Sequence, residues 1–142
     1  MPAIPPEEAL ALLAGSSVGV LATVRPDGSP HAVPFVFAVS GRTLYWAVDR
    51  KPKRTEALQR LSNIRANPRV EVLVHRYEED WSRLWWVRGT GTARVLEPGD
   101  EARDALNLLA QRRPQYRAAP PAGPVVAIDL LRWSGWRASE PV

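Results

Sequence analysis

The sequence predicts a mainly β, α+β protein in which six antiparallel strands form a barrel with peripheral helices. Two observations carry this prediction: short runs of alternating apolar residues are separated by turn residues, and only three segments show helical spacing. Several strands with so few helices must close on themselves or expose their edges, and a barrel satisfies that constraint. The strands are expected at residues 18–24, 32–39, 44–48, 70–74, 84–96 and 125–133.

Turn residues and glycines mark the ends and bends of these strands. Asp27-Gly28 is typical of a hairpin turn between the first two strands, and Ser40-Gly41 closes the second. In the long strand over 84–96, Gly89 and Gly91 would permit the bends or bulges of a closing barrel.

Three helices are expected around the barrel. Residues 5–15 begin with prolines and glutamates, which suit the first turn and the N-terminal dipole of a helix. The second helix spans 53–66, has one apolar face and is stopped by Asn67-Pro68, and the third spans about 98–111. The segment 114–124 is rich in proline and alanine and is predicted to be an extended connector.

Length and composition limit the classes of function. A chain of 142 residues is expected to form one domain, residues 1–142. The absence of cysteine excludes disulfides and thiolate metal sites, and no run is long and apolar enough for a membrane span, so a cytoplasmic protein with no membrane partner is expected. The net charge of +4 is modest and concentrated at residues 50–60, which favours a local anion site and predicts no nucleic-acid partner.

The most chemically suggestive residues are cations at the start of the second helix. Arg50, Lys51, Lys53 and Arg54 gather where the helix is expected to begin, and such a cluster suits a phosphate group. Arg60 follows Lys53 by two helical turns, about 10.5 Å along the same face. The alternative is a solvated helix face, because cations at a helix start oppose the dipole.

Histidines and tryptophans offer weaker signals. His31 and His75 lack a neighbouring carboxylate or cysteine pattern, so no metal site is predicted. Trp85 and Trp86 are adjacent in a predicted strand and must point to opposite faces. One of them can therefore pack in the core while the other lines a pocket or an interface. No nucleophile constellation and no phosphate-binding glycine loop is present, so no catalytic side chain is predicted.

In their order and spacing these elements resemble the pyridoxamine 5′-phosphate oxidase-like (PPOX-class) split-barrel flavoproteins. The closer resemblance is to the deazaflavin-dependent branch of that family, whose members use coenzyme F420. Four blocks that together cover most of the chain carry the resemblance: GVLATVRPDGSPHAVPFVF (Gly19–Phe37), DRKPKRTEALQRLSNIRANPRV (Asp49–Val70), EDWSRLWWVRGTG (Glu79–Gly91) and RWSGWRAS (Arg132–Ser139).

The resemblance implies an FMN-binding split barrel of six strands and an oxidoreductase activity. Coenzyme F420 would transfer a hydride to or from a small organic substrate, with FMN as the alternative cofactor of the same fold. A different class of function, a non-catalytic module that binds a flavin or heme-type ligand, stays open as well.

The resemblance also implies roles for individual residues. Lys53 is the first choice for the cofactor phosphate, followed by Arg54 and Thr55, while Arg50, Lys51 and Arg60 would bind the polyglutamate tail. The strand that contains His31, Val33 and Pro34 would lie along the deazaflavin ring, and Trp86 would line the cofactor pocket. A homodimer is expected, to which Trp85, Trp86, Trp133 and Trp136 would contribute.

Overall fold

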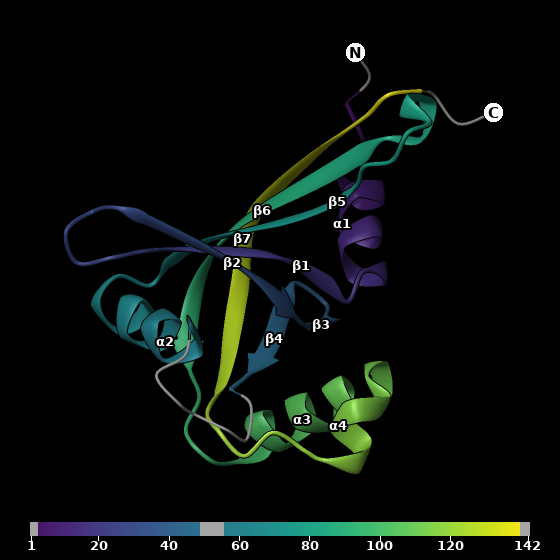
Figure 1. The fold of residues 1–142 in the computed structure, drawn as a ribbon. Coiled ribbons are helices and arrows are strands. Elements are labelled where there is room, and N and C mark those ends of the chain that lie inside the picture. Colours follow the sequence, from purple (N-terminus) through teal and green to yellow (C-terminus); the bar gives the residue numbers. More distant parts are fainter. Residues whose placement is uncertain (1–2, 49–55, 140–142) are drawn as a thin grey trace.

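The computed structural model describes residues 3–48 and 56–139, and these form one antiparallel sheet with helices around it (Figure 1). The seven strands follow the order β2-β1-β5-β6-β7-β4-β3. Their bounds are β1 Val18–Val24, β2 Pro30–Val36, β3 Ala38–Ser40, β4 Thr43–Ala47, β5 Arg69–Arg76, β6 Trp85–Val95 and β7 Val125–Arg137. The fold is the expected split barrel, with seven strands in place of six.

The additional strand arises because the predicted strand over 32–39 is broken at Phe37. The part before this residue, β2, pairs with β1, whereas the part after it, β3, pairs with β4 at the opposite end of the sheet. The Phe37 N–H donates to the Ser17 carbonyl at 3.0 Å, and its buried ring stacks on Phe35 at 4.9 Å. The two edge strands of the sheet are therefore consecutive in the chain, which closes the barrel.

Within the described residues, four helices lie around the sheet, together with a short 3₁₀ turn η1, Trp81–Arg83. The helices are α1 Pro6–Gly15, α2 Glu56–Ala66, α3 Asp100–Arg112 and α4 Pro114–Ala118. The last of these corrects the expectation of an extended connector over 114–124. Pro114 occupies the first turn of α4, where its missing N–H costs nothing, and the helix packs on α3. No helix within the described residues is long and apolar enough to cross a membrane.

The strands β6 and β7 are the longest in the sheet, and they pair with each other. Their pairing runs from Trp85↔Arg137 to Val95↔Val126, so β7 extends beyond the predicted end at residue 133. The register shifts between Thr90 and Gly91, as the glycine pattern predicts. A Cβ atom at Gly91 would lie 2.7 Å from the Asp129 carbonyl oxygen, so only glycine permits this close approach.

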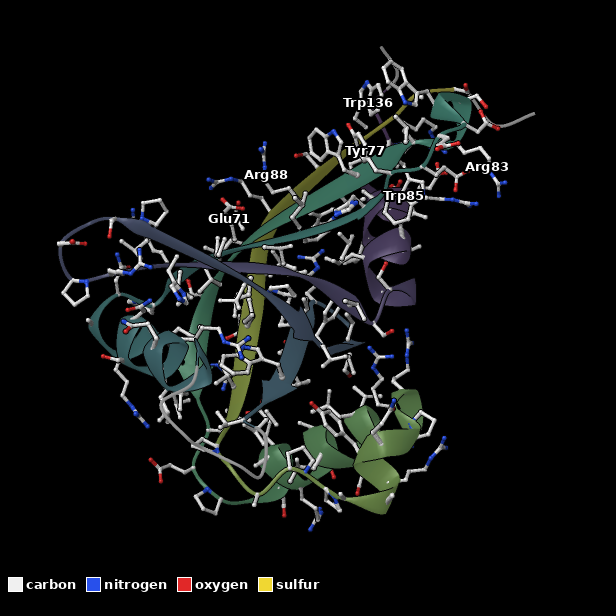
Figure 2. The ribbon with its side chains drawn as sticks, viewed as in Figure 1. Glu71, Tyr77, Arg83, Trp85, Arg88 and Trp136 are labelled. Carbon is white, nitrogen blue, oxygen red and sulfur yellow. The ribbon has the colours of Figure 1, made fainter. Side chains whose placement is uncertain are left out.

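Alternation along the strands divides the sheet into an inner and an outer face. Val70, Val72 and Val74 of β5 point inward and are buried in the core. Figure 2 shows Glu71, Arg88, Tyr77 and Trp136 on one side of the long strands, whereas Trp85 lies on the side that α1 covers. The outer face of β5, β6 and β7 carries no helix in Figure 1.

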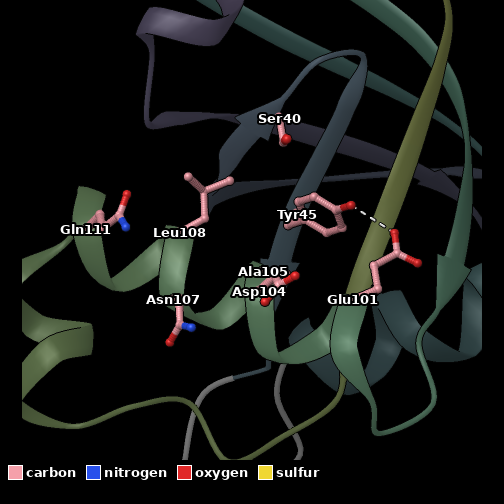
Figure 3. Close-up of a pocket in the computed structure, with 8 residues that line it drawn as sticks. All are labelled: Ser40, Tyr45, Glu101, Asp104, Ala105, Asn107, Leu108 and Gln111. Carbon is pink, nitrogen blue, oxygen red and sulfur yellow. Dashed lines mark hydrogen bonds between the residues drawn. The ribbon is translucent and has the colours of Figure 1, made fainter.

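A network of ion pairs and hydrogen bonds joins the start of α3 to strands β4, β6 and β7. Arg94 of β6 donates to both oxygens of Asp129, at 2.6 and 3.1 Å, and to both oxygens of Glu101, at 3.1 and 3.0 Å. The Tyr45 hydroxyl donates to Glu101 at 2.8 Å (Figure 3). Because Tyr45, Arg94 and Asp129 come from three strands, the network fixes the start of α3 relative to the sheet.

We predict that Tyr45→Phe lowers the free energy of unfolding by about 1 kcal/mol, through loss of the hydrogen bond to Glu101. Burial, and then the bond to Glu101, raise the pKa of Tyr45 to about 12. An acid whose pKa is raised on folding contributes stability that is lost as pH rises through the folded value. Wild-type stability should therefore decline between the ordinary tyrosine pKa of about 10 and pH 12 more steeply than that of the variant.

Urea unfolding measured across this alkaline range checks the prediction, and equal slopes for the two proteins would contradict it. The acid side gives an independent control. Arg94, through its hydrogen bonds, lowers the pKa of both Asp129 and Glu101. The stability from Asp129 is present above its ordinary pKa and is lost as pH falls through the lowered value, in wild type and Tyr45→Phe alike. Glu101 is not part of this control, because the Tyr45 hydroxyl also lowers its pKa.

Candidate functional site

The outer face of β5 and β6 contains a hollow of about 420 Å³ with aromatic walls. It is lined by Leu73, His75, Tyr77, Trp86 and Arg88. The register pairs His75 with Trp86 and Leu73 with Arg88, so period-two alternation brings these side chains to one face. The Arg88 guanidinium carbon lies 5.3 Å from the Trp86 ring centroid, and His75 meets Tyr77 edge-on at 5.8 Å.

A second hollow of about 300 Å³ adjoins the first and shares Arg88 with it. Its lining residues are Glu71, Arg88, Thr90, Arg132, Trp133 and Ser134. The Thr90 hydroxyl donates to Glu71 Oε1 at 2.8 Å. The other carboxylate oxygen, Glu71 Oε2, is buried and has no hydrogen-bond partner among the described residues.

Together the two hollows can hold a flat ligand that carries negative charge. Their volumes fall at the low end of the range for small-molecule sites, and both are open to solvent on one side. Aromatic walls favour a planar ring, and Arg88 and Arg132 outnumber the single carboxylate of Glu71. Within the ranges 3–48 and 56–139, no three His, Asp or Glu side chains gather to hold a metal ion.

The residues expected along the cofactor ring divide between the two faces of the sheet. Pro34 is exposed on the outer face, in the same register row as Val20 and Leu73. His31 and Val33 have the opposite parity, so they point to the other face of β2, and His31 is buried. The structure thus brings Pro34 and Trp86 to one face and leaves His31 and Val33 on the other.

The expected cation cluster falls mostly outside the described residues. Arg50, Lys51, Lys53, Arg54 and Thr55 lie there, so their roles stay predictions. Arg60 is described: its guanidinium carbon lies 4.5 Å from the ring centroid of the buried Trp46. This residue therefore packs on the barrel wall and is not part of a fully solvated helix face.

A buried polar contact anchors α2, the helix that follows the cation cluster. Asn63 is fully buried and donates from Nδ2 to the Thr23 hydroxyl of β1 at 2.9 Å. Gln59 Nε2 donates in turn to Asn63 Oδ1 at 2.8 Å. The helix is thereby fixed to the inner face of β1.

The sequence analysis missed Glu71, Arg88 and Arg132 as members of this site. A signal was present in β5, where Glu71 and His75 alternate with buried valines and so mark an outer face of mixed chemistry. The position of Arg132 could not be read from the sequence, because the shift at Thr90 and Gly91 decides which β7 residue faces Thr90.

An antiparallel sheet whose two edge strands are consecutive in the chain, with few helices around it, is the architecture of a split barrel. The family model described as pyridoxamine 5′-phosphate oxidase matches residues 5–137, and the chain belongs to that family.

Solved structures share this fold over almost the whole chain. A FAD-binding protein from Mesorhizobium loti is 23% identical, with a TM-score of 0.72 over 94% of this chain and 95% of that chain. A conserved hypothetical protein from Mycobacterium tuberculosis is 22% identical, with a TM-score of 0.77 over 95% and 86%. A heme-binding protein from Mycobacterium smegmatis is 20% identical, with a TM-score of 0.75 over 98% of this chain and 57% of that chain.

We predict that Asn63→Ala lowers the free energy of unfolding by about 2 kcal/mol, because a buried hydroxyl loses its partner. In a Thr23→Val background the same substitution should cost clearly less, since both polar groups are then gone. Chemical denaturation of the four proteins measures this coupling. Ser62→Ala is the control at an exposed position of the same helix outside this network, and it should change stability by less than about 0.5 kcal/mol. Strictly additive effects at residues 23 and 63 would contradict the prediction.

Proposed function

We propose that this protein is an oxidoreductase that uses coenzyme F420 to transfer a hydride to or from a small organic substrate, with FMN as the alternative cofactor. One observation carries the proposal: the outer-face hollow combines the Trp86 and Tyr77 rings with the Arg88 guanidinium. Such walls suit a flat heterocycle with an anionic extension. The cation run over residues 50–60 supports the same ligand, because it suits a phosphate and an acidic tail.

The chemistry would come from the cofactor, which supplies the hydride when bound. The chain's own residues bind and orient. Trp86 and Tyr77 would flank the ring and keep water from it, and Arg88 would attract negative charge on cofactor or substrate. Lys53, Arg54 and Thr55 would bind the phosphate, and Arg50, Lys51 and Arg60 the tail.

A non-catalytic ligand-binding role is the second candidate, and His75 is the observation that favours it. This imidazole is exposed at the wall of the aromatic hollow, and imidazole is a common axial ligand of heme iron. One structural neighbour is described as heme-binding and another as FAD-binding. Both ligands therefore belong in the first binding experiment.

We predict that the chain binds F420 more tightly than FMN, FAD or heme. Isothermal titration is a suitable measurement, because it does not depend on Trp86, the residue in the hollow that the first variant removes. Trp86→Ala should weaken F420 binding while leaving the unfolding midpoint nearly unchanged. Trp85→Ala is the matched control: Trp85 packs against the core, so this change should lower stability and spare affinity. Equal or tighter binding of FMN would contradict the F420 assignment, and tight heme binding that His75→Ala abolishes would favour the second candidate.

We predict that Lys53→Ala weakens cofactor binding by about 1.5–3 kcal/mol, the loss expected for a hydrogen bond to a charged group. The stability of the cofactor-free protein should hardly change. Arg65→Ala provides a matched loss of charge, because Arg65 is exposed in the last turn of α2. Isothermal titration and thermal melting separate the two effects. Unchanged affinity with a lower melting temperature would assign Lys53 a structural role.

We also propose that the protein acts as a homodimer. The structure distinguishes the four tryptophans expected at the interface. Trp86 and Trp136 are cross-strand partners on the outer face, whereas Trp85 packs against the core and the Trp133 indole N–H donates to the Pro6 carbonyl at 2.8 Å. Trp86 and Trp136 are therefore the pair available to a second subunit.

A further inference from the structure

A cation of helix α2 lies over a buried aromatic ring of the barrel. Arg60 is half-buried, and its guanidinium carbon lies 4.5 Å from the ring centroid of Trp46 in β4. Trp46 is only 1% exposed and belongs to the hydrophobic core. A guanidinium over the face of a tryptophan is attracted to the ring, and the attraction is stronger where water is excluded. The contact therefore joins the second turn of α2 to β4.

The guanidinium of Arg60 is turned toward the protein. Its Nε and Nη1 atoms are buried. The ring beneath it is held by the core, because Trp46 pairs with the buried Val126 of β7. An arginine that binds an acidic tail needs its N–H donors at the surface. The burial of these two atoms therefore favours a different role for Arg60.

Helix α2 has a second contact with the barrel. One turn after Arg60, the buried Asn63 donates to the Thr23 hydroxyl of β1 at 2.9 Å. Leu61 and Ile64 of the same helix are buried in the core. The helix is therefore joined to two strands, to β4 through Arg60 and to β1 through Asn63.

The chain that leaves β4 is also fixed, up to residue 48. The Val48 N–H donates to the Pro124 carbonyl at 3.0 Å, and the Gly123 N–H donates to the Val48 carbonyl at 3.1 Å. A Cβ atom at Gly123 would lie 2.5 Å from the Cβ of Val48, so only glycine permits this close approach. The cations that the proposed function assigns to the cofactor phosphate thus follow a fixed strand and precede a fixed helix.

We propose that Arg60 is a positioning residue for the cofactor phosphate: its contact with Trp46 ties α2 to β4 and so fixes the two elements that flank the cations of residues 50–54. The inference rests on the proposed function and revises one residue of it, because Arg60 then acts through Trp46 and not through the tail. Binding a phosphate orders the groups that hold it, and this ordering costs free energy. When both flanking elements are already fixed, less of that cost remains, and the affinity for the phosphate rises.

Isothermal titration with matched ligands tests the proposal. FMN and riboflavin differ only in the phosphate, so the ratio of their dissociation constants measures the phosphate preference of each variant. F420 carries both a phosphate and an acidic tail. Arg60→Ala should reduce the phosphate preference by about threefold or more and weaken F420 binding by a similar factor, because both cofactors depend on the same phosphate site. A loss of affinity for F420 without a loss for FMN would demonstrate a direct tail contact and overturn the proposal.

Substitutions of Trp46 establish whether Arg60 acts through the ring. Trp46→Leu removes the aromatic face and should reduce the phosphate preference as Arg60→Ala does, whereas Trp46→Phe keeps an aromatic face and should retain most of it. In an Arg60→Ala background, Trp46→Leu should cause no further reduction. Where Trp46→Leu fails to fold, as judged by circular dichroism, Trp46→Phe completes the cycle, and its smaller effect should likewise vanish in the Arg60→Ala background.

Two matched variants are the controls. Trp85→Leu makes the same change at a tryptophan that packs against the core on the side that α1 covers, and it should lower the melting temperature without altering the phosphate preference. Arg65→Ala removes an exposed charge from the same helix and should also leave the preference unchanged. An equal reduction in Trp85→Leu would identify lost stability as the cause and overturn the proposal.

The failure of this inference differs from the failure of the proposed function. A wild type that prefers FMN to riboflavin, with Arg60→Ala unchanged or with additive effects at residues 46 and 60, would overturn the positioning role alone. A wild type that binds FMN no more tightly than riboflavin, or that binds none of the three ligands, would overturn the phosphate site of the proposed function and this role with it.

Discussion

The fold depends on the continuity of the chain at Phe37. Because β2 and β3 are separated by this one residue and lie at opposite ends of the strand order, the sheet must curve until its edges meet. Phe37 secures the corner with its N–H on Ser17 and its buried ring on Phe35. Because the sheet is closed, its inner face lines the core. Its outer face, on the long strands β5 and β6, carries no helix in Figure 1.

Closure also decides which residues can share a site. In a strand, neighbours in sequence point to opposite faces, so one closed sheet separates Val33 from Pro34 and Trp85 from Trp86. Pro34 and Trp86, far apart in sequence, come to the outer face. The outer face collects aromatic and charged groups, whereas the helix-covered face holds the α2 anchor at Asn63 and Thr23.

Much of this architecture is encoded locally and could be predicted. Alternation, the Asp27-Gly28 turn and the paired glycines of β6 gave the strands and the bulge, and the family blocks gave the split barrel. The break at Phe37 could not be predicted, because β2 and β3 form one continuous apolar run and only tertiary pairing separates them. The helix at residues 114–118 could not be predicted either, because proline indicates an extended chain except in the first turn of a helix, which is where Pro114 lies.

Two clusters of charged residues in this chain differ in whether all of their charged groups have hydrogen-bond partners among the described residues. Around Arg94, one guanidinium donates to two carboxylates and a tyrosine hydroxyl donates to one of them, so the group is complete. Exposed pairs of that kind contribute little beyond holding two elements in place, here α3 and the sheet. Around Glu71, a buried oxygen and two guanidiniums stay unpaired within the described chain, although all three lie close enough to line one hollow. A complete cluster stabilises the fold that contains it, whereas the buried oxygen of Glu71 has no hydrogen-bond donor within the described residues and adds nothing of that kind to the fold.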